Sequence, residues 1–328
     1  MGQMQTLNNE HKSKSAFLNE IRGRLLELSC GSELAKGIGL LNAFYDGLGQ
    51  EKIKELQQYQ DFLRQEDLGS YRFICEAGRL FSSSFGQDQS TSIRSVCMVG
   101  QSAISANDET DLMIKGREED QLISIKLIKN NAYINTKSAG IKSIFSKYFD
   151  DFNFQKQLNQ SVDIFFEQMK INFFNHYGFE ERGLSFAELL KEEGLSDRPG
   201  DLEGEVKGFV LDFYKKCIDE IRKNFINLYE KKKSSFIEML APLSGFSSKE
   251  IIKYIFFHDP DYLALEMEVH DITSLKTDEI QISEVKGHTS FLISMKKLDL
   301  QIRVKPMNSF LSPSLKVNCS VKYKKSPE

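Results

Sequence analysis

Residues 108–138, DETDLMIKGREEDQLISIKLIKNNAYINTKS, decide the fold class of this chain. Asp111 opens a short apolar run, a charged turn follows, and a second apolar run carries Lys126. Two apolar runs on either side of a polar turn predict a β-hairpin. If the hairpin closes near residues 116–120, Asp111 and Lys126 lie within one residue of direct register at its open end. The sequence therefore predicts an acid and a lysine side by side at a strand edge.

An Asp and a Lys in this arrangement are the minimum set for metal-dependent hydrolysis of a phosphodiester. A divalent ion needs a carboxylate oxygen as ligand, and a nearby lysine can orient or activate the attacking water. We therefore expect Asp111 and Lys126 to be catalytic. The structural alternative is that Asp111 only starts a strand and that Lys126 points outward between apolar neighbours.

With Ser124 and Ile125 between them, Asp111 and Lys126 resemble the motif of the PD-(D/E)xK nucleases, which include many type II restriction endonucleases. The family pattern is an Asp, a spacer, an acid, any residue and a Lys. Ser124 stands where the family has Asp or Glu, so the match is incomplete. The resemblance implies that Asp111, a second carboxylate and the Ile125 carbonyl bind Mg²⁺, and that Ser124 belongs to the catalytic site.

A carboxylate from a neighbouring helix replaces the missing acid in some restriction enzymes, and the resemblance implies the same here. Glu76 is the first choice, because it lies in the helix expected directly before the strands. Asp108 and Glu109 are the alternatives. The resemblance covers only residues 76–143, and its motif is short.

The function implied by this resemblance is that of a Mg²⁺-dependent, sequence-specific endonuclease acting on double-stranded DNA. If both strands of a palindrome are cut, the resemblance implies a homodimer. It also implies a cognate methyltransferase as a partner in the same restriction system. Ser124 keeps open a second hypothesis, a DNA-binding or defence scaffold without catalysis. A third, a protein-interaction module built on the helical half, predicts no affinity for DNA even at low salt.

Charge is distributed unevenly along the 328 residues, although the net charge is only -4. Residues 286–325 contain nine Lys or Arg and one Asp, and residues 121–149 contain five Lys and no acid. Two basic segments in an acidic chain predict a phosphate-binding face. Candidate DNA contacts are Asn130, Asn131, Asn135, Lys137, Ser138, Arg303, Lys305, Asn308 and Lys316. Asn can read base edges, whereas Lys and Ser suit phosphates. The alternative is a solvated loop and an ordinary hairpin with lysines on its edge.

Other site chemistries find little support in the sequence. The five cysteines are odd in number and form no CxxC pair, and the five histidines show no HxxxH spacing. A disulfide framework and a helix-borne zinc site are therefore not expected. No apolar run approaches the ~20 residues of a membrane span, and the polar start lacks a secretory signal. These features predict a reduced, cytoplasmic protein. His258 and Asp259 are expected in a turn after a helix, not in a phosphohydrolase site.

The hydrophobic periods predict a mixed α/β fold in a single composite domain, 1–328. Helical spacing dominates residues 1–92, the core strands and one helix fall in 93–150, a helical insertion spans 151–258, and period-two strands fill 259–328. Within the insertion we expect a linker at 178–204, a long helix at 205–240 and a short helix at 247–256. The resemblance implies a restriction-endonuclease-like mixed sheet flanked by helices.

Overall fold

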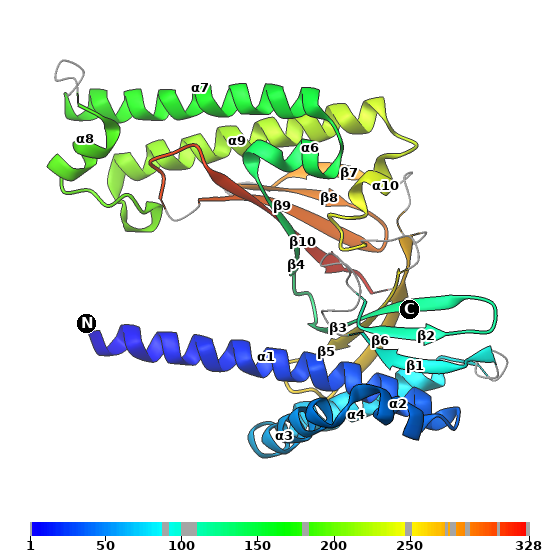
Figure 1. Cartoon of the computed structure of the whole chain (residues 1–328). Coiled ribbons are helices and arrows are strands. Elements are labelled where there is room, and N and C mark those ends of the chain that lie inside the picture. The colour runs from blue at the N-terminus through cyan, green and yellow to red at the C-terminus, as the bar shows by residue number, and fades with distance from the viewer. Residues whose placement is uncertain are drawn as a thin grey trace. The chain divides into compact units, whose positions relative to one another are not determined.

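The protein is a mixed α/β chain in the computed structural model, which describes residues 2–86, 92–99, 110–178, 184–246, 251–272, 275, 280–285, 289–306 and 309–325 (Figure 1). It divides into two compact units. The first comprises Met1–Ala132, Phe246–Ser274 and Lys325–Glu328, and the second comprises Tyr133–Gly245 and Leu275–Lys324. Each unit has its own five-stranded sheet.

Four helices open the first unit, as the helical spacing of residues 1–92 predicts. They are α1 (Gly2–Gly37), α2 (Leu41–Leu48), α3 (Gln50–Glu66) and α4 (Leu68–Ser83). Asp67 caps α4 by accepting a hydrogen bond from the backbone N–H of Ser70 at 3.0 Å. α1 and α4 pack closely because Gly78 has no side chain: a Cβ there would lie 2.8 Å from the backbone carbonyl of Ser29.

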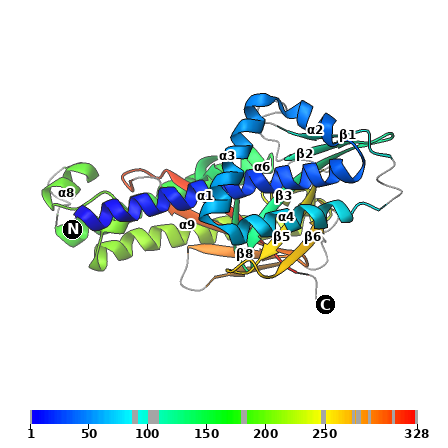
Figure 2. The same cartoon turned by 90° about the horizontal axis from the view of Figure 1, so that it is seen from below.

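The sheet of the first unit is mixed and has the order β1-β2-β3-β5-β6. Its strands are β1 (Ser95–Met98), β2 (Leu112–Lys115), β3 (Asp120–Lys129), β5 (Ile251–His258) and β6 (Leu265–His270). β3 is antiparallel to β2 and parallel to β5. Alternate residues, among them Ile123 and Ile125, join the buried core beneath the helices. Figure 2 shows α1 and α4 running over this sheet.

The helix expected at residues 247–256 was a wrong prediction. Residues 247–250 lie outside the described residues, and Ile251–His258 forms β5. The sequence IIKYIFFH is a continuous apolar run, which periodicity alone cannot assign to a helix or a strand. Five of the eight residues in a row, Lys253–Phe257, are buried, as expected for a strand between two neighbours.

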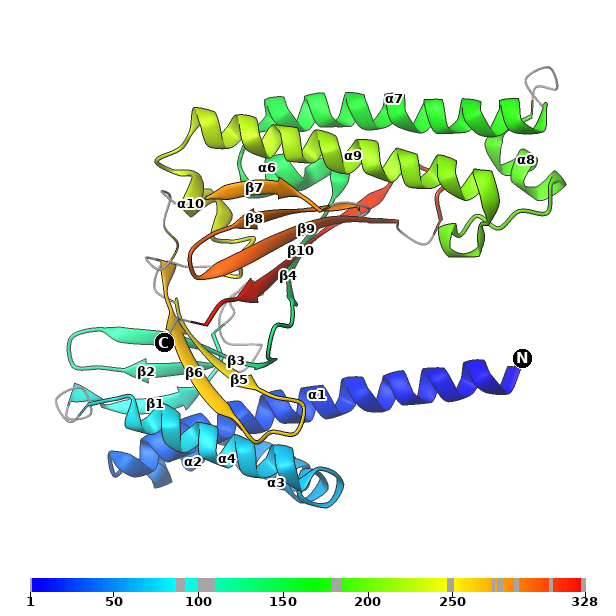
Figure 3. The ribbon, with the colours of Figure 1, turned by 180° about the vertical axis from the view of Figure 1, so that it is seen from behind.

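The second unit is built on an antiparallel sheet of order β4-β10-β9-β8-β7. Its strands are β4 (Ile134–Gly140), β7 (Gln281–Glu284), β8 (Ser290–Ser294), β9 (Leu298–Pro306) and β10 (Leu315–Tyr323). Its helical elements are η1 (Ile141–Ser143), α6 (Ile144–Tyr148), α7 (Phe152–Tyr177), α8 (Phe186–Glu192), η2 (Pro199–Asp201), α9 (Gly204–Lys231) and α10 (Phe236–Leu240). Figure 3 shows α7 and α9 side by side along one face of the sheet.

Phenylalanines fill the core between these helices and the sheet. Phe225 of α9 is fully buried and its ring lies 5.1–5.5 Å from the rings of three others, Phe145, Phe149 and Phe291. Edge-on and tilted ring pairs at such separations add to the stabilisation that burial provides.

The expected domain boundaries differ from the two units. β4 follows β3 in the chain but pairs with β10, so the core strands predicted at 93–150 are divided between two sheets. The linker expected at 178–204 contains α8, which Ser185 and Glu188 cap reciprocally, and the long helix expected at 205–240 ends at Lys231 before α10. Within the described residues, no helix combines the length and the apolarity needed to cross a membrane.

Candidate functional site

The carboxylate of Asp111 lies just before β2 and receives three hydrogen bonds on one oxygen. The backbone N–H of Ile125 donates to Asp111 Oδ2 at 2.6 Å, Ser124 Oγ donates at 3.3 Å and Lys126 Nζ donates at 3.2 Å. The Asp111 backbone N–H also donates to the Ile123 carbonyl at 2.8 Å. Just before β2 begins, the Asp111 side chain thus accepts the hydrogen bond of a β3 backbone N–H that a backbone carbonyl would otherwise accept. Four hydrogen bonds in all hold Asp111 in its orientation.

Lys126 forms an ion pair with Asp111 that is open to solvent on one side. Its side chain is 33% exposed and that of Asp111 is 17% exposed. The hairpin brings the two residues together because Leu112 pairs with Ile123 and Lys115 with Asp120. The pair is therefore accessible from solvent, mainly at Lys126.

The carbonyl of Ile125 points toward the same place as its N–H, since both groups of one residue project to the same side of a strand. The Ile125 N–H donates to the Asp111 carboxylate. Two residues earlier in the strand, the Ile123 carbonyl accepts a hydrogen bond from the Asp111 N–H, so both residues face the β2 side. The Ile125 carbonyl is therefore directed to the strand edge that β2 leaves open. This is the position that the resemblance assigns to a backbone ligand.

Glu27 of α1 is a second carboxylate at this site, and the sequence analysis missed it. Its side chain is only 14% exposed, and Arg24 Nη1 lies 3.5 Å from Glu27 Oε2. Burial, followed by the negative charge of Asp111, raises the pKa of Glu27 to about 7, while Arg24 and Lys126 act in the opposite direction. The available signal was an acid within an apolar stretch, flanked by Leu26 and Leu28, which are both buried; acids in such surroundings usually have a partner.

Glu76 lies away from Asp111. Phe73 and Ala77 belong to the buried face of α4, whereas Glu76 is exposed to solvent. The expectation that Glu76 completes the site therefore has no contact to support it within the described part of the chain. The alternatives Asp108 and Glu109 lie outside the described residues.

Ser124 has a structural contact at the site. Its side chain is fully buried, and its hydroxyl donates to the same Asp111 oxygen as Lys126 does. The serine thus orients the aspartate. It lies too deep to meet a substrate directly.

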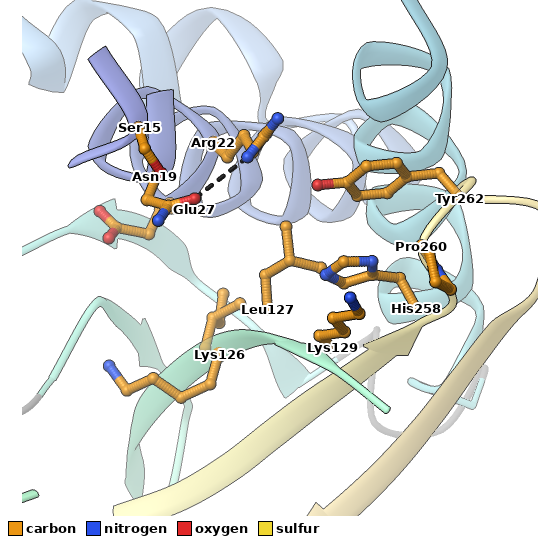
Figure 4. Close-up of a pocket in the computed structure, with 12 residues that line it drawn as sticks. Ser15, Asn19, Arg22, Glu27, Lys126, Leu127, Lys129, His258, Pro260 and Tyr262 are labelled. Atoms are coloured by element: carbon orange, nitrogen blue, oxygen red, sulfur yellow. Dashed lines mark hydrogen bonds between the residues drawn. The ribbon is translucent and has the colours of Figure 1, made fainter. Parts of the chain in front are cut away.

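A cavity of about 770 Å³ adjoins the Asp111 site within the first unit. Residues of α1, the end of β3 and the turn after β5 line it; they are Ser15, Asn19, Arg22, Gly23, Glu27, Ile125, Lys126, Leu127, Lys129, His258, Pro260 and Tyr262. Figure 4 shows Glu27 and Lys126 reaching it from α1 and from β3. Burial lowers the pKa of His258, so its ring is neutral near pH 7. A turn does follow at residues 260–261, but His258 is the last residue of strand β5, so the helix expected before that turn was a wrong prediction.

Several predicted DNA contacts gather on one face of the sheet of the second unit. Residues directly paired across strands share a face, and the pairing aligns Arg303 with Asn318 and Asn318 with Ser138, as well as Lys305 with Lys316. Arg303 Nη2 donates to Asn135 Oδ1 at 3.3 Å and to Ser320 Oγ at 3.1 Å. Two basic segments that are far apart in the sequence thus contribute neighbouring strands, β4, β9 and β10.

The remaining predicted contacts lie elsewhere. Lys137 pairs with buried Cys319 and so belongs to the opposite face, because the register shifts between Cys319 and Ser320. Asn130 and Asn131 belong to the first unit, where they end β3 in a tight turn. Asn131 has φ +64°, a conformation that Asn tolerates well. Asn308 lies outside the described residues.

Comparison of the chain with protein-family models, curated proteins and solved structures gave no match. The geometry of the site is therefore the basis for a function. Within the described residues, no three His, Cys, Asp or Glu side chains form a group that could hold a metal ion. The site offers instead two carboxylates, one backbone carbonyl and one lysine.

Proposed function

We propose that this protein is a Mg²⁺-dependent endonuclease that hydrolyses phosphodiester bonds in DNA at the Asp111 site. The observation that carries this proposal is the convergence of Asp111, Lys126 and Glu27 from three separate elements. A carboxylate, a lysine 3.2 Å from it and a second acid close enough to interact with both charges are the kinds of group that such hydrolysis uses. The mixed sheet flanked by helices agrees with the fold class that the resemblance to PD-(D/E)xK nucleases implies.

The residues fit Mg²⁺ by the chemistry of their donor atoms. Asp111 and Glu27 would hold the ion with carboxylate oxygens, together with the Ile125 carbonyl. Mg²⁺ prefers oxygen ligands and is often bound by one or two carboxylates plus substrate phosphate and water. Burial first, and then the negative charge of Asp111, raises the pKa of Glu27, and a bound cation would favour the ionised form of both carboxylates. When bound, Mg²⁺ supplies Lewis acidity and lowers the pKa of a bound water.

The protein's own groups perform the remaining tasks. Ile125 N–H and Ser124 Oγ hold Asp111 in one orientation, so that its second oxygen faces away from β3. The Lys126 ammonium donates hydrogen bonds and positions the attacking water beside the scissile phosphate. Because Lys126 is partly exposed, it can exchange its contact with Asp111 for one with substrate.

The polar face of the second sheet is the surface that we propose for contacts with double-stranded DNA. Arg303, Lys305 and Lys316 suit phosphates, and Asn135 and Ser138 suit base edges or phosphates. Replacing Lys305 or Lys316 by Ala should weaken binding of all sequences about equally and reduce the slope of log K against log salt by about 1. A matched replacement of Lys137, which lies on the other face, should leave this slope unchanged.

A non-catalytic DNA-binding scaffold is the second candidate, and Ser124 is the observation that favours it. The family motif has an acid at this position, and a protein that had lost it would bind DNA without cutting. Glu27 weakens this alternative, because it supplies a carboxylate from a helix.

Relaxation of supercoiled plasmid DNA in Mg²⁺ tests the proposal. Asp111→Ala, Glu27→Gln and Lys126→Ala should each lower the initial rate at least 100-fold, as expected when a metal ligand or a group at the reacting phosphate is removed. Glu76→Gln and Lys115→Ala replace an exposed acid and an exposed lysine of the same unit and should keep the wild-type rate. Full activity in Asp111→Ala would remove the proposed site.

A further inference from the structure

The cavity next to Asp111 has the size of a small-molecule site. Its volume of about 770 Å³ falls within the ~300–1,000 Å³ typical of ligand pockets. It extends from Glu27 and Lys126 at the proposed hydrolase site to Lys129, His258 and Tyr262. A substrate strand bound at Lys126 would therefore have a defined place for its next nucleotide.

Lys129 provides a free cation at the far end of this cavity. It is exposed, and no ion pair of Lys129 occurs among the described residues. Arg22, the other cation on this side, is already engaged: its Nη2 lies 2.7 Å from Asp67 Oδ2 and its Nη1 donates to Asn19 at 3.0 Å. An anionic group entering the cavity would therefore find its charge partner in Lys129.

Tyr262 forms a rigid polar wall between the two ends. Its ring is stacked on His258 with centroids 4.3 Å apart and planes 6° from parallel, and the Arg22 guanidinium lies 5.6 Å from the ring centroid. The turn is fixed as well, since Leu263 N–H donates to Asp259 Oδ1 at 2.8 Å. Figure 4 shows the Tyr262 hydroxyl directed toward α1 across the cavity. His258 covers one face of the ring, so the group that Tyr262 offers to the cavity is its hydroxyl.

We propose that this cavity binds one unpaired nucleotide, with its outer phosphate on Lys129 and its polar edge on the Tyr262 hydroxyl and Asn19. This inference rests on the proposed function, because the inner phosphate of that nucleotide is the one placed at Lys126. Lys129 follows Lys126 by three positions, ~10 Å along the strand, and both residues line the cavity. A cation at each end and neutral polar groups between them match a phosphate–nucleoside–phosphate segment.

The nucleotide must be unpaired because the cavity lies between α1 and the ends of two strands. A base inside it cannot keep a Watson–Crick partner that is stacked in a duplex. Enzymes that take a base out of a duplex lose the energy of unpairing, and single strands or strand ends avoid that loss. We therefore expect kcat/KM to be 10- to 100-fold higher for a single strand or an unpaired end than for the same sequence in a closed duplex.

Binding of thymidine 3′,5′-bisphosphate tests the cavity without any cleavage. Isothermal titration of the full chain in EDTA should show one site. Lys129→Ala should weaken binding about tenfold and Tyr262→Phe about threefold, the losses expected for a charged and a neutral hydrogen bond. Lys115→Ala, which removes an exposed lysine of the neighbouring strand β2, is the matched control and should bind like wild type. No binding, or equal weakening by Lys129→Ala and Lys115→Ala, would overturn the inference.

Cleavage rates with matched single-stranded and duplex oligonucleotides separate this inference from the proposed function. Binding that depends on Lys129, without cleavage of any DNA, would support the nucleotide site and remove the hydrolase. Cleavage that depends on Asp111, with equal rates on both substrates and no effect of Lys129→Ala on the bisphosphate, would keep the hydrolase and remove the nucleotide site.

Discussion

Replacing Glu27 by Gln should stabilise the protein in the absence of metal, although it removes a proposed functional group. The pKa of Glu27 rises from 4.5 to about 7 on folding, so the folded state binds its proton more tightly than the unfolded state does. Stability therefore falls as pH rises from 4.5 to 7, and the whole loss is present above pH 7. At 1.36 kcal/mol per pKa unit, the loss amounts to about 3 kcal/mol. Gln carries no charge at any pH, so the Glu27→Gln variant does not lose this stability.

Urea unfolding followed by circular dichroism at pH 8 and pH 5 measures this effect. At pH 8 Glu27→Gln should exceed wild type by about 3 kcal/mol in the free energy of unfolding, and at pH 5 by less than about 1 kcal/mol. Glu20→Gln, an exposed change on the same helix, should stay within ~0.5 kcal/mol of wild type. Mg²⁺ at pH 8 should stabilise wild type more than Glu27→Gln, because only wild type keeps both carboxylates. A variant less stable than wild type at pH 8 would refute this account of Glu27.

Three further substitutions test the packing and the role of the serine. Ser124→Ala removes one of the donors to Asp111 and should cost about 1 kcal/mol while lowering the cleavage rate less than tenfold, whereas a hundredfold loss would assign the hydroxyl a chemical role. Phe225→Ala should lower the free energy of unfolding by about 3–5 kcal/mol in denaturant titrations, against ~0.5 kcal/mol or less for Phe152→Ala, whose side chain is 69% exposed. Gly78→Ala should lower the free energy of unfolding by about 1–3 kcal/mol, because the added Cβ would press on Ser29. Gly208→Ala, with open space around it, should raise the free energy of unfolding by ~0.5–1 kcal/mol. The reverse order would contradict the close approach of α1 and α4.

Local sequence patterns were sufficient for the hairpin that carries Asp111 and Lys126. Two apolar runs on either side of a polar turn define β2 and β3, and the hairpin register places the two side chains within hydrogen-bonding distance. The helical spacing of residues 1–92 likewise predicted the helical region that contains α1 to α4. These features depend on contacts between residues that are close in the chain.

Features that depend on distant contacts could not be predicted in this way. The continuous apolar run of β5 fits a helix or a strand equally well, and only pairing with β3 and β6 makes it a strand. Glu27 lies close enough to Asp111 for their charges to interact because α1 packs over the sheet, an arrangement that the spacing within α1 does not specify. The face of Lys137 depends on a register shift between β4 and β10, which are more than 170 residues apart.

Digestion of unmethylated phage DNA in Mg²⁺ by wild type and by Asp111→Ala, with EDTA as a second control, tests the central claim most directly. The account predicts DNA cleavage by wild type alone, with discrete fragments if the enzyme is sequence-specific. A salt-sensitive gel shift without any cleavage would contradict the hydrolase and favour the DNA-binding scaffold. Equal cleavage by Asp111→Ala would show that the activity resides elsewhere.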